Sequence, residues 1–260
     1  MFRWMMGALT LLALAAPARA YPTALITVPT AGIQPFKGYH LGLAAAMQRT
    51  GSSSPLAMAS LAVGLTPWFP LTETLSAGAL EAGVDLYYPF PFENGLYPAR
   101  GLTSATGPTL AQPHLKLGLL QETDWLPGLA AGVYGIALPD WQTSANLVHL
   151  SLSRTVTVAG IDLGQWTLAG YHGNPQVLRG PTNDDASNGF MLGFFRNLPY
   201  DLYVMADYTS GQHRTGGLNL ALGWAINERL SLTVGGFTAN AGEAEDKALL
   251  LLDYVDELTF

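Results

Sequence analysis

Segments of about ten residues, in which large apolar side chains alternate with small or polar ones, recur along most of the chain. The stretch 218–226, Leu-Asn-Leu-Ala-Leu-Gly-Trp-Ala-Ile, shows the pattern most clearly. A β-strand has a side-chain period of two, so such a segment has one apolar face and one face of small or polar residues. The pattern therefore predicts an all-β protein.

The first twenty residues have the features of a secretory signal peptide. Arg3 supplies the basic region, Met5 to Ala15 form an apolar stretch, and Ala18-Arg19-Ala20 is a small-x-small cleavage site. The alternative is a helical membrane anchor, but this apolar run is too short for a bilayer of about 30 Å. Cleavage after Ala20 would leave ten basic and nineteen acidic residues, a formal charge of −9.

The composition is unusually apolar for an exported chain. Hydrophobic residues make up 49% and charged residues only 12%, against about 25% charged in ordinary soluble domains. No later segment has the roughly 18 consecutive apolar residues of a membrane helix. Backbone groups in lipid must pair internally, which a closed barrel achieves. We therefore expect a signal peptide (1–20), an extended segment (21–37) and a closed antiparallel transmembrane barrel (38–260) in the outer membrane of a Gram-negative-type bacterium.

Turn-forming residues divide the barrel region into about twelve strands. Tight connections such as 66–70, 197–200 and 227–229 alternate with long ones such as 90–111, 174–187 and 240–247, as in outer-membrane barrels. An even strand count would place both ends of the barrel in the periplasm. The expected strands are 38–50, 56–66, 71–89, 112–121, 128–139, 146–156, 161–173, 188–197, 201–210, 216–226, 230–239 and 248–260.

The alternation assigns a face to each charged strand residue. A Lys or Arg facing mid-membrane lipid costs about 2–4 kcal/mol, so the charged face must be the interior one. The alternative is a soluble sandwich or small-ligand barrel, which would need a charged exterior, whereas the candidate exterior faces hold mainly Ala, Gly, Ser and Thr. The lumen-facing polar candidates are Glu81, Asp85, His114, Lys116, His149 and Asp207. Such a set can be a satisfied network in a narrow lumen or a polar path for a small solute.

Aromatic residues gather near the expected strand ends, where interfacial girdles sit. The predicted partners are accordingly outer-membrane lipids and lipopolysaccharide. The terminal Phe260 resembles the C-terminal signal recognised during barrel insertion, which implies the barrel-assembly machinery as a partner. The acidic balance argues against nucleic acid. The girdle candidates are Trp68, Tyr88, Trp125, Tyr208 and Trp224.

Two segments outside the strands have several possible positions. Residues 21–37, with Pro22, Pro29 and Pro35, could lie in the lumen or the periplasm, or add a strand. Loop 90–111 is long and aromatic, and could constrict the mouth or rest on the rim. The alternation also fails at Leu249 to Leu252, a continuous apolar run.

Several short motifs resemble those of a broad set of bacterial outer-membrane barrels of unassigned function, similar in style to YjbH-like barrels. This resemblance implies a location and a fold, and brings no catalytic residues. The sequence departs from the pattern by the additional residues Phe69 to Ala79. The matching motifs are Pro22-Thr23-Ala24, Val63-Gly64-Leu65-Thr66-Pro67, Leu80-Glu81-Ala82-Gly83-Val84-Asp85, Leu115-Lys116-Leu117, Leu126 to Val133, and Ala206-Asp207-Tyr208.

The leading expectation for function is a passive channel or binder for an unidentified small solute, or an envelope-structural barrel, with no enzyme activity, cofactor or metal. One alternative is an accessory barrel for export or envelope biogenesis. Another is a lipid-acting hydrolase around Ser187, because Ser187-Asn188-Gly189 is similar to the serine motif of outer-membrane acyl hydrolases. Those enzymes have a histidine two residues before the serine, where this chain has Asp185. The chain has no cysteine, which excludes thiolate metal sites and cysteine nucleophiles.

Overall fold

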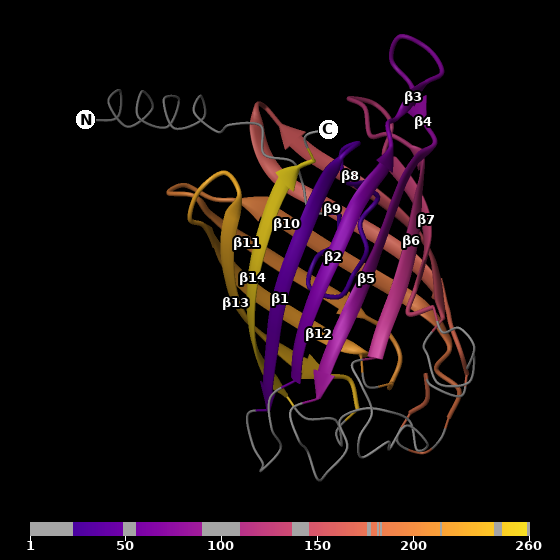
Figure 1. Ribbon diagram of the computed structural model, residues 1–260, viewed down its shortest axis with the longest axis vertical. Helices are drawn as coiled ribbons and strands as arrows, with labels where there is room; N and C mark the ends of the chain where they lie inside the picture. The colour runs from indigo at the N-terminus through magenta and orange to yellow at the C-terminus, as the bar shows by residue number, and fades with distance from the viewer. Residues whose placement is uncertain are drawn as a thin grey trace.

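A computed structural model of the chain contains a closed antiparallel barrel of twelve strands (Figure 1). β14 pairs with β1 from Glu257 opposite Gly38 to Lys247 opposite Gln48, and this pairing closes the sheet. The prediction of an all-β closed barrel of about twelve strands is confirmed. The structure describes residues 23–48, 56–89, 110–136, 146–175, 178–180, 182, 184–213, 215–241 and 246–258.

Each barrel strand pairs with its neighbours in sequence, except that β2 pairs with β5 because a small two-stranded sheet, β3–β4, lies between them. The strands are β1 (Gly38–Gln48), β2 (Leu56–Thr66), β3 (Phe69–Pro70), β4 (Ser76–Ala77), β5 (Ala79–Pro89), β6 (Leu110–Leu120), β7 (Gly128–Tyr134), β8 (Leu147–Val158), β9 (Ile161–His172), β10 (Asn188–Asn197), β11 (Leu202–Thr209), β12 (Gly217–Ala225), β13 (Leu230–Ala239) and β14 (Lys247–Glu257).

The two ends of the barrel differ in the length of their connections. β8 and β9 are joined through Ala159 and Gly160 alone, both with positive φ (51° and 79°), as a two-residue hairpin turn requires. The start of β1 and the end of β14 lie at this same short-turn end, and the long connections lie at the other (Figure 1). The predicted asymmetry therefore holds for the β8–β9 turn, but not for the connection between β2 and β5, which has twelve residues and lies at the short-turn end.

One predicted strand is wrong at its start. We expected a single strand over 71–89, but the barrel strand β5 begins at Ala79. Residues 67–78 instead form a connection in which Phe69 pairs with Ala77 and Pro70 with Ser76. The predicted tight turn at 66–70 is therefore the first half of a longer hairpin, because Pro67 and Pro70 interrupt the strand pattern and the chain leaves the barrel wall before it returns.

The apolar run at the end of the chain keeps strict alternation in the structure. Leu250 and Leu252 of β14 are exposed on the outer wall at 41% and 36%. Leu249 and Leu251 pair with Ala46 and Ala44 of β1 and face the lumen with them. The pattern was obscured because the lumen wall is itself apolar on this strand.

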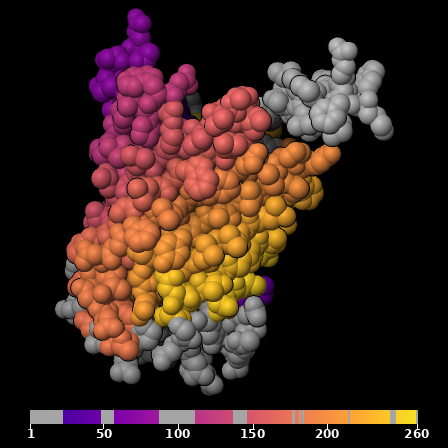
Figure 2. All heavy atoms as spheres, turned by 180° about the vertical axis from the view of Figure 1, so that it is seen from behind, coloured from indigo at the N-terminus to yellow at the C-terminus, as the bar shows by residue number. Residues whose placement is uncertain are grey.

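The outer wall of the barrel is apolar along its length. Leu150, Trp166, Leu168, Leu220 and Val234 are each about half exposed although they lie in regular strands. Figure 2 shows the wall over β8 to β13 as a continuous surface of side chains. In water this exposed apolar area would be a large liability, whereas in lipid it matches its surroundings. The described residues include no helix long and apolar enough to cross a membrane.

Candidate functional site: an occupied lumen

Residues 23–36 lie inside the barrel as a folded segment, the indigo loop seen between the front strands in Figure 1. Leu25 N donates to Val28 O at 2.9 Å and Thr30 N donates to Thr23 O at 3.1 Å, which makes a tight hairpin. Val28 and Thr30 have no solvent-exposed surface. Of the three positions left open for residues 21–37, the lumen is the one observed for the described part.

Asp207 of β11 is the main anchor of this segment. Its Oδ2 accepts hydrogen bonds from Thr27 N at 2.8 Å and Val28 N at 3.3 Å. Its Oδ1 accepts from the Thr27 hydroxyl at 3.0 Å and from Asn219 Nδ2 at 2.6 Å. With only 2% of Asp207 exposed, these four donors replace the water that an ionised carboxylate would otherwise require.

Three further lumen side chains hold the backbone of the segment. Ser153 Oγ accepts from Ala31 N at 2.8 Å, and Glu81 Oε2 accepts from Gln34 N at 2.8 Å. Lys116 Nζ donates to Thr23 O at 2.6 Å and lies 3.5 Å from Glu81 Oε1. The segment contains no charged residue, so its peptide groups are what the lumen recognises.

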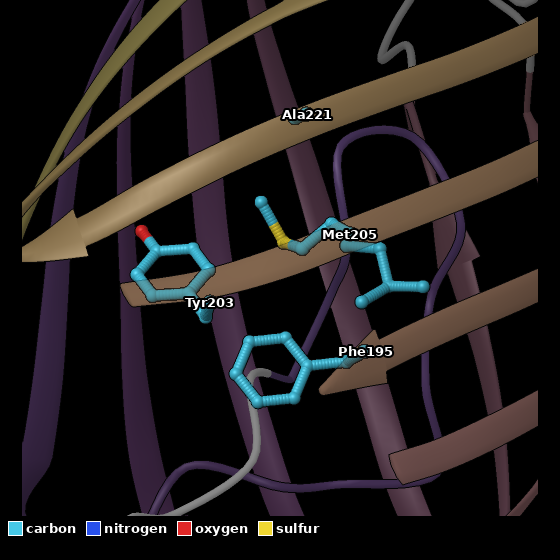
Figure 3. Close-up of a cluster of buried hydrophobic side chains, with 5 residues drawn as sticks. Phe195, Tyr203, Met205 and Ala221 are labelled. Carbon is cyan, nitrogen blue, oxygen red and sulfur yellow. The ribbon is translucent and has the colours of Figure 1, made fainter. Parts of the chain in front are cut away.

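Apolar contacts fill the space around these anchors. Leu25 packs in a cluster with Phe195, Tyr203, Met205 and Ala221, whose labelled side chains project into the interior in Figure 3. The other clusters place Val28 with Ala169, Tyr171, Leu178 and Met191, and Ala31 and Ile33 with Ala79 and Ala130. The segment is therefore packed like a protein core against strands from β5 to β12.

The glycine at position 64 makes room for the segment where it enters the barrel. A Cβ at Gly64 would lie 2.0 Å from the Pro35 carbonyl oxygen and 2.5 Å from that of Gln34. We expect Gly64→Ala to lower the free energy of unfolding in lipid vesicles by about 1–3 kcal/mol, because two backbone atoms must move. Gly170→Ala is the matched control, since a Cβ there meets nothing within 4 Å. Equal stability of the two variants would contradict this close approach.

The lumen has a dry side and a wet side. Glu81, Lys116 and Asp207, which hold the segment, are at most 2% exposed. On the opposite side, His40 of β1 and Asp253 of β14 face the lumen 2.8 Å apart, with side chains 26% and 27% exposed. Solvent therefore reaches the lumen wall along β14, β1 and β2.

The six polar candidates all lie on lumen-facing positions but form separate groups. Glu81 and Lys116 form a buried ion pair, and Asp207 stands apart on β11. His114 lies 3.8 Å from Asp85, and the Tyr134 ring stacks on His114 with centroids 4.8 Å apart and contacts His149 at 5.4 Å. The residues that sequence reasoning missed are Ser153, Asn219, His40 and Asp253.

At the long-loop end, the chain folds back over the segment. Leu178 from the β9–β10 connection is 4% exposed within the Val28 cluster. The Tyr171 hydroxyl lies 2.8 Å from both Ser210 O and His213 Nε2, and Thr215 Oγ1 lies 2.9 Å from His213 Nδ1. Burial lowers the pKa of His213 from 6.5 to about 4.

The lowered pKa of His213 predicts that the folded protein loses stability in acid. Above pH 6.5 the imidazole is neutral whether the chain is folded or unfolded, so the burial of His213 carries no protonation cost. As the pH falls from 6.5 towards 4, only the unfolded chain takes up the proton. When the pH is lowered from 7.5 to 4.5, we expect the free energy of unfolding of the parent protein to fall by about 2 kcal/mol more than that of the His213→Gln variant. Urea unfolding in vesicles at a series of pH values measures both. Parallel pH profiles for the two proteins would contradict this role.

Ser187 does not have the surroundings of an activated nucleophile. It is 2% exposed, and its hydroxyl accepts from Asn188 Nδ2 at 3.2 Å. Hydrogen bonds from Ser187 lower the pKa of Asp185, so this carboxylate is a weak base. His172 Nδ1 lies 2.7 Å from Asn188 Oδ1, which leaves the histidine paired with asparagine.

The girdle candidates fall into three groups. Trp125, Trp224 and Tyr208 lie on outward positions, the first two at the short-turn end and Tyr208 near the long loops. Trp68 differs, because the 67–78 connection places it against Ile33 and over Gly118, inside the end of the barrel. The side chain of Tyr88, together with Phe260 and loop 90–109, lies outside the described residues.

Among the described residues, no group of three or more His, Asp or Glu side chains is arranged to hold a metal ion. Glu81, Lys116 and Asp207 are instead bound to the inserted segment.

No family model matches the sequence, and no curated protein matches it. Among solved structures, the chain is similar to the outer-membrane phospholipase A of Escherichia coli, with 11% identity, a TM-score of 0.47 and coverage of 88% of this chain and 96% of that one. The KdgM porin has 9% identity, a TM-score of 0.45 and coverage of 83% and 98%. An outer-membrane channel of Pseudomonas putida F1 has 12% identity, a TM-score of 0.45 and coverage of 93% and 100%. At such low identities and scores, the role of the site is inferred from its own geometry.

Proposed function

We propose that the protein is a passive outer-membrane channel of a Gram-negative-type bacterium, which lets small solutes pass along one side of a partly filled lumen. The observation that carries the proposal is the contrast between the two sides of the lumen. Residues 23–36 pack against the dry side, whereas the side chains of His40 and Asp253 keep about a quarter of their surface exposed inside the barrel. Solute selection would then depend on size and on the lumen charges.

The experiment is single-channel conductance in planar bilayers. The full mature chain is compared with a variant that lacks residues 23–36, and folding of both is first checked by heat-modifiable migration on gels. We expect a small, steady conductance for the full chain and one several-fold larger for the deletion, because the segment fills the other side of the lumen. Folded barrels that conduct in neither form would overturn the proposal.

The surroundings of Ser187 support a channel over a hydrolase, because its hydroxyl is buried and its neighbouring carboxylate, Asp185, is a weak base. The accessory-barrel alternative and the kinship with YjbH-like barrels remain predictions from the sequence. Co-purification of a periplasmic protein or polysaccharide would favour the accessory role.

A further inference from the structure

Two carboxylates of the lumen wall, Asp253 and Asp85, lie in one hydrogen-bonded row of the sheet. β-sheet register places Asp253 opposite Gly42, Gly42 opposite Ser60, and Ser60 opposite Asp85. These residues therefore lie in one row across β14, β1, β2 and β5. A row of this kind at mid-strand is encountered by any solute that passes along this wall.

Two glycines make room for the polar side chains of this row. A Cβ at Gly42 would lie 2.3 Å from Ser60 Oγ and 3.3 Å from Asp253 Oδ1, so the bare backbone there lets these groups converge. A Cβ at Gly83 would lie 2.3 Å from His114 Nε2 in the same way. Gly42 and Gly83 thus accommodate Ser60, Asp253 and His114, and we call the polar groups along this row, with Asp85, the cradle.

One polar atom in this cradle has no hydrogen-bond partner. His114 Nδ1 is unpartnered although the side chain is only 6% exposed, and it points at Asp85 Oδ2 from 3.8 Å. That distance is too long for a hydrogen bond between them. The same distance suits two acceptor atoms that bind one donor nitrogen of a ligand between them. Such a nitrogen could lie about 2.8 Å from each acceptor.

The charges around the cradle favour a cation. Asp253 is paired with His40 at 2.8 Å, whereas Asp85 lies 3.8 Å from His114, with Ser60 and Gln112 opposite it in the neighbouring strands. The nearest ammonium, Lys116, is fully buried and neutralised by Glu81 at 3.5 Å. Lys247 lies at the far end of β14, six residues from Asp253 or about 20 Å along the strand.

The wall next to the cradle is apolar. One step towards the long loops, Leu251 pairs with Ala44 and Ala44 pairs with Met58, and all three are partly exposed in the lumen. Leu249 and Ala46 continue this wall by one more step. Of these residues Met58 is the nearest to Asp85 in register, because it lies on β2 one lumen-facing position beyond Ser60, which is opposite Asp85.

We propose that this cradle binds a small organic ammonium ion, with the ammonium between Asp85 Oδ2 and His114 Nδ1 and its alkyl part towards Met58. An ammonium has three donors and no acceptor, which matches a carboxylate oxygen beside an unpartnered imidazole nitrogen. The inference rests on the proposed function, since it names the solute class that the channel would prefer.

The test is a ligand-observed NMR titration of the full mature chain, refolded in detergent, with n-butylammonium as the probe. We expect saturable binding that Asp85→Asn weakens at least tenfold and that Asp85→Glu largely restores. Asp253→Asn is expected to weaken it several-fold. Asp124→Asn, the same change in an exposed turn, should stay within twofold of the parent chain.

Uncharged butanol and anionic butyrate should show no dependence on Asp85. Binding unaffected by Asp85→Asn in a heat-modifiable, folded barrel would overturn the inference, as would full displacement of n-butylammonium by equimolar potassium. Because the titration needs no ion flow, Asp85-dependent binding to a non-conducting barrel would sustain the site and refute the channel. Conductance without such binding would do the reverse.

Discussion

Replacing Asp207 with alanine is expected to lower the free energy of unfolding by about 2–4 kcal/mol and to release residues 23–36 from the lumen. The carboxylate, which is 2% exposed, accepts from Thr27 N, Val28 N, the Thr27 hydroxyl and Asn219 Nδ2. Alanine would leave two peptide N–H groups without an acceptor. Urea unfolding in lipid vesicles measures the first effect, and proteolysis of the folded barrel within residues 23–36 measures the second.

Asp124→Ala is the control for this change, because Asp124 is exposed in the turn between β6 and β7 and should shift stability by less than about 0.5 kcal/mol. If Asp207→Ala protects residues 23–36 from protease as well as the parent does, then the anchoring role of this carboxylate is wrong.

Leu220→Arg is expected to destabilise the barrel in vesicles by about 2–4 kcal/mol, because it places a charge on the outer wall near mid-membrane. Leu220 lies in the middle of β12 and is 56% exposed. Leu71→Arg is the matched control: Leu71 is 62% exposed, but it lies in the β3–β4 connection outside the barrel wall. An equal, small cost at both positions would argue that the outer wall of β12 does not face lipid.

The barrel could be predicted because apolar and polar residues alternate with a period of two in nearly every strand. Strands 56–66, 188–197 and 230–239 were predicted at their observed bounds, since prolines, glycines or polar residues mark their ends. Strand 71–89 was wrong because its apolar residues continue through Leu71 and Leu75 into a hairpin outside the wall. Local pattern alone does not tell such an insertion from a strand.

The inserted segment could not be placed from sequence because it has no period of its own. Its position depends on partners such as Asp207, which lies 180 residues from Thr27 along the chain. A usable signal was the absence of any charge in 21–36 beside a lumen rich in charges. The peptide N–H and C=O groups of such a segment can then provide the hydrogen bonds that buried charged side chains of the lumen require.

The lumen-facing candidates were chosen because a charged side chain is costly in lipid. Uncharged residues that hold the segment, such as Ser153 and Asn219, were therefore missed. Asp253 was missed for another reason: the leucines before it hid the alternation of β14. In the structure, odd-numbered residues from Lys247 onward face the lumen, which would have assigned Asp253 to the interior.

The central claim is that residues 23–36 lie in the lumen and limit the passage of ions. The most direct test is a reversible disulfide that holds this segment in place in the Asp207→Ala variant. A Cβ at Gly128 would lie 3.3 Å from the Ala31 Cβ, close to disulfide geometry, and the chain has no other cysteine. Single-channel conductance of Ala31→Cys, Gly128→Cys, Asp207→Ala is measured before and after oxidation. We predict a large conductance when reduced and a several-fold smaller one when oxidised, restored by reductant. The same conductance in both states, with the disulfide shown to have formed, would contradict a lumen-seated segment that limits passage.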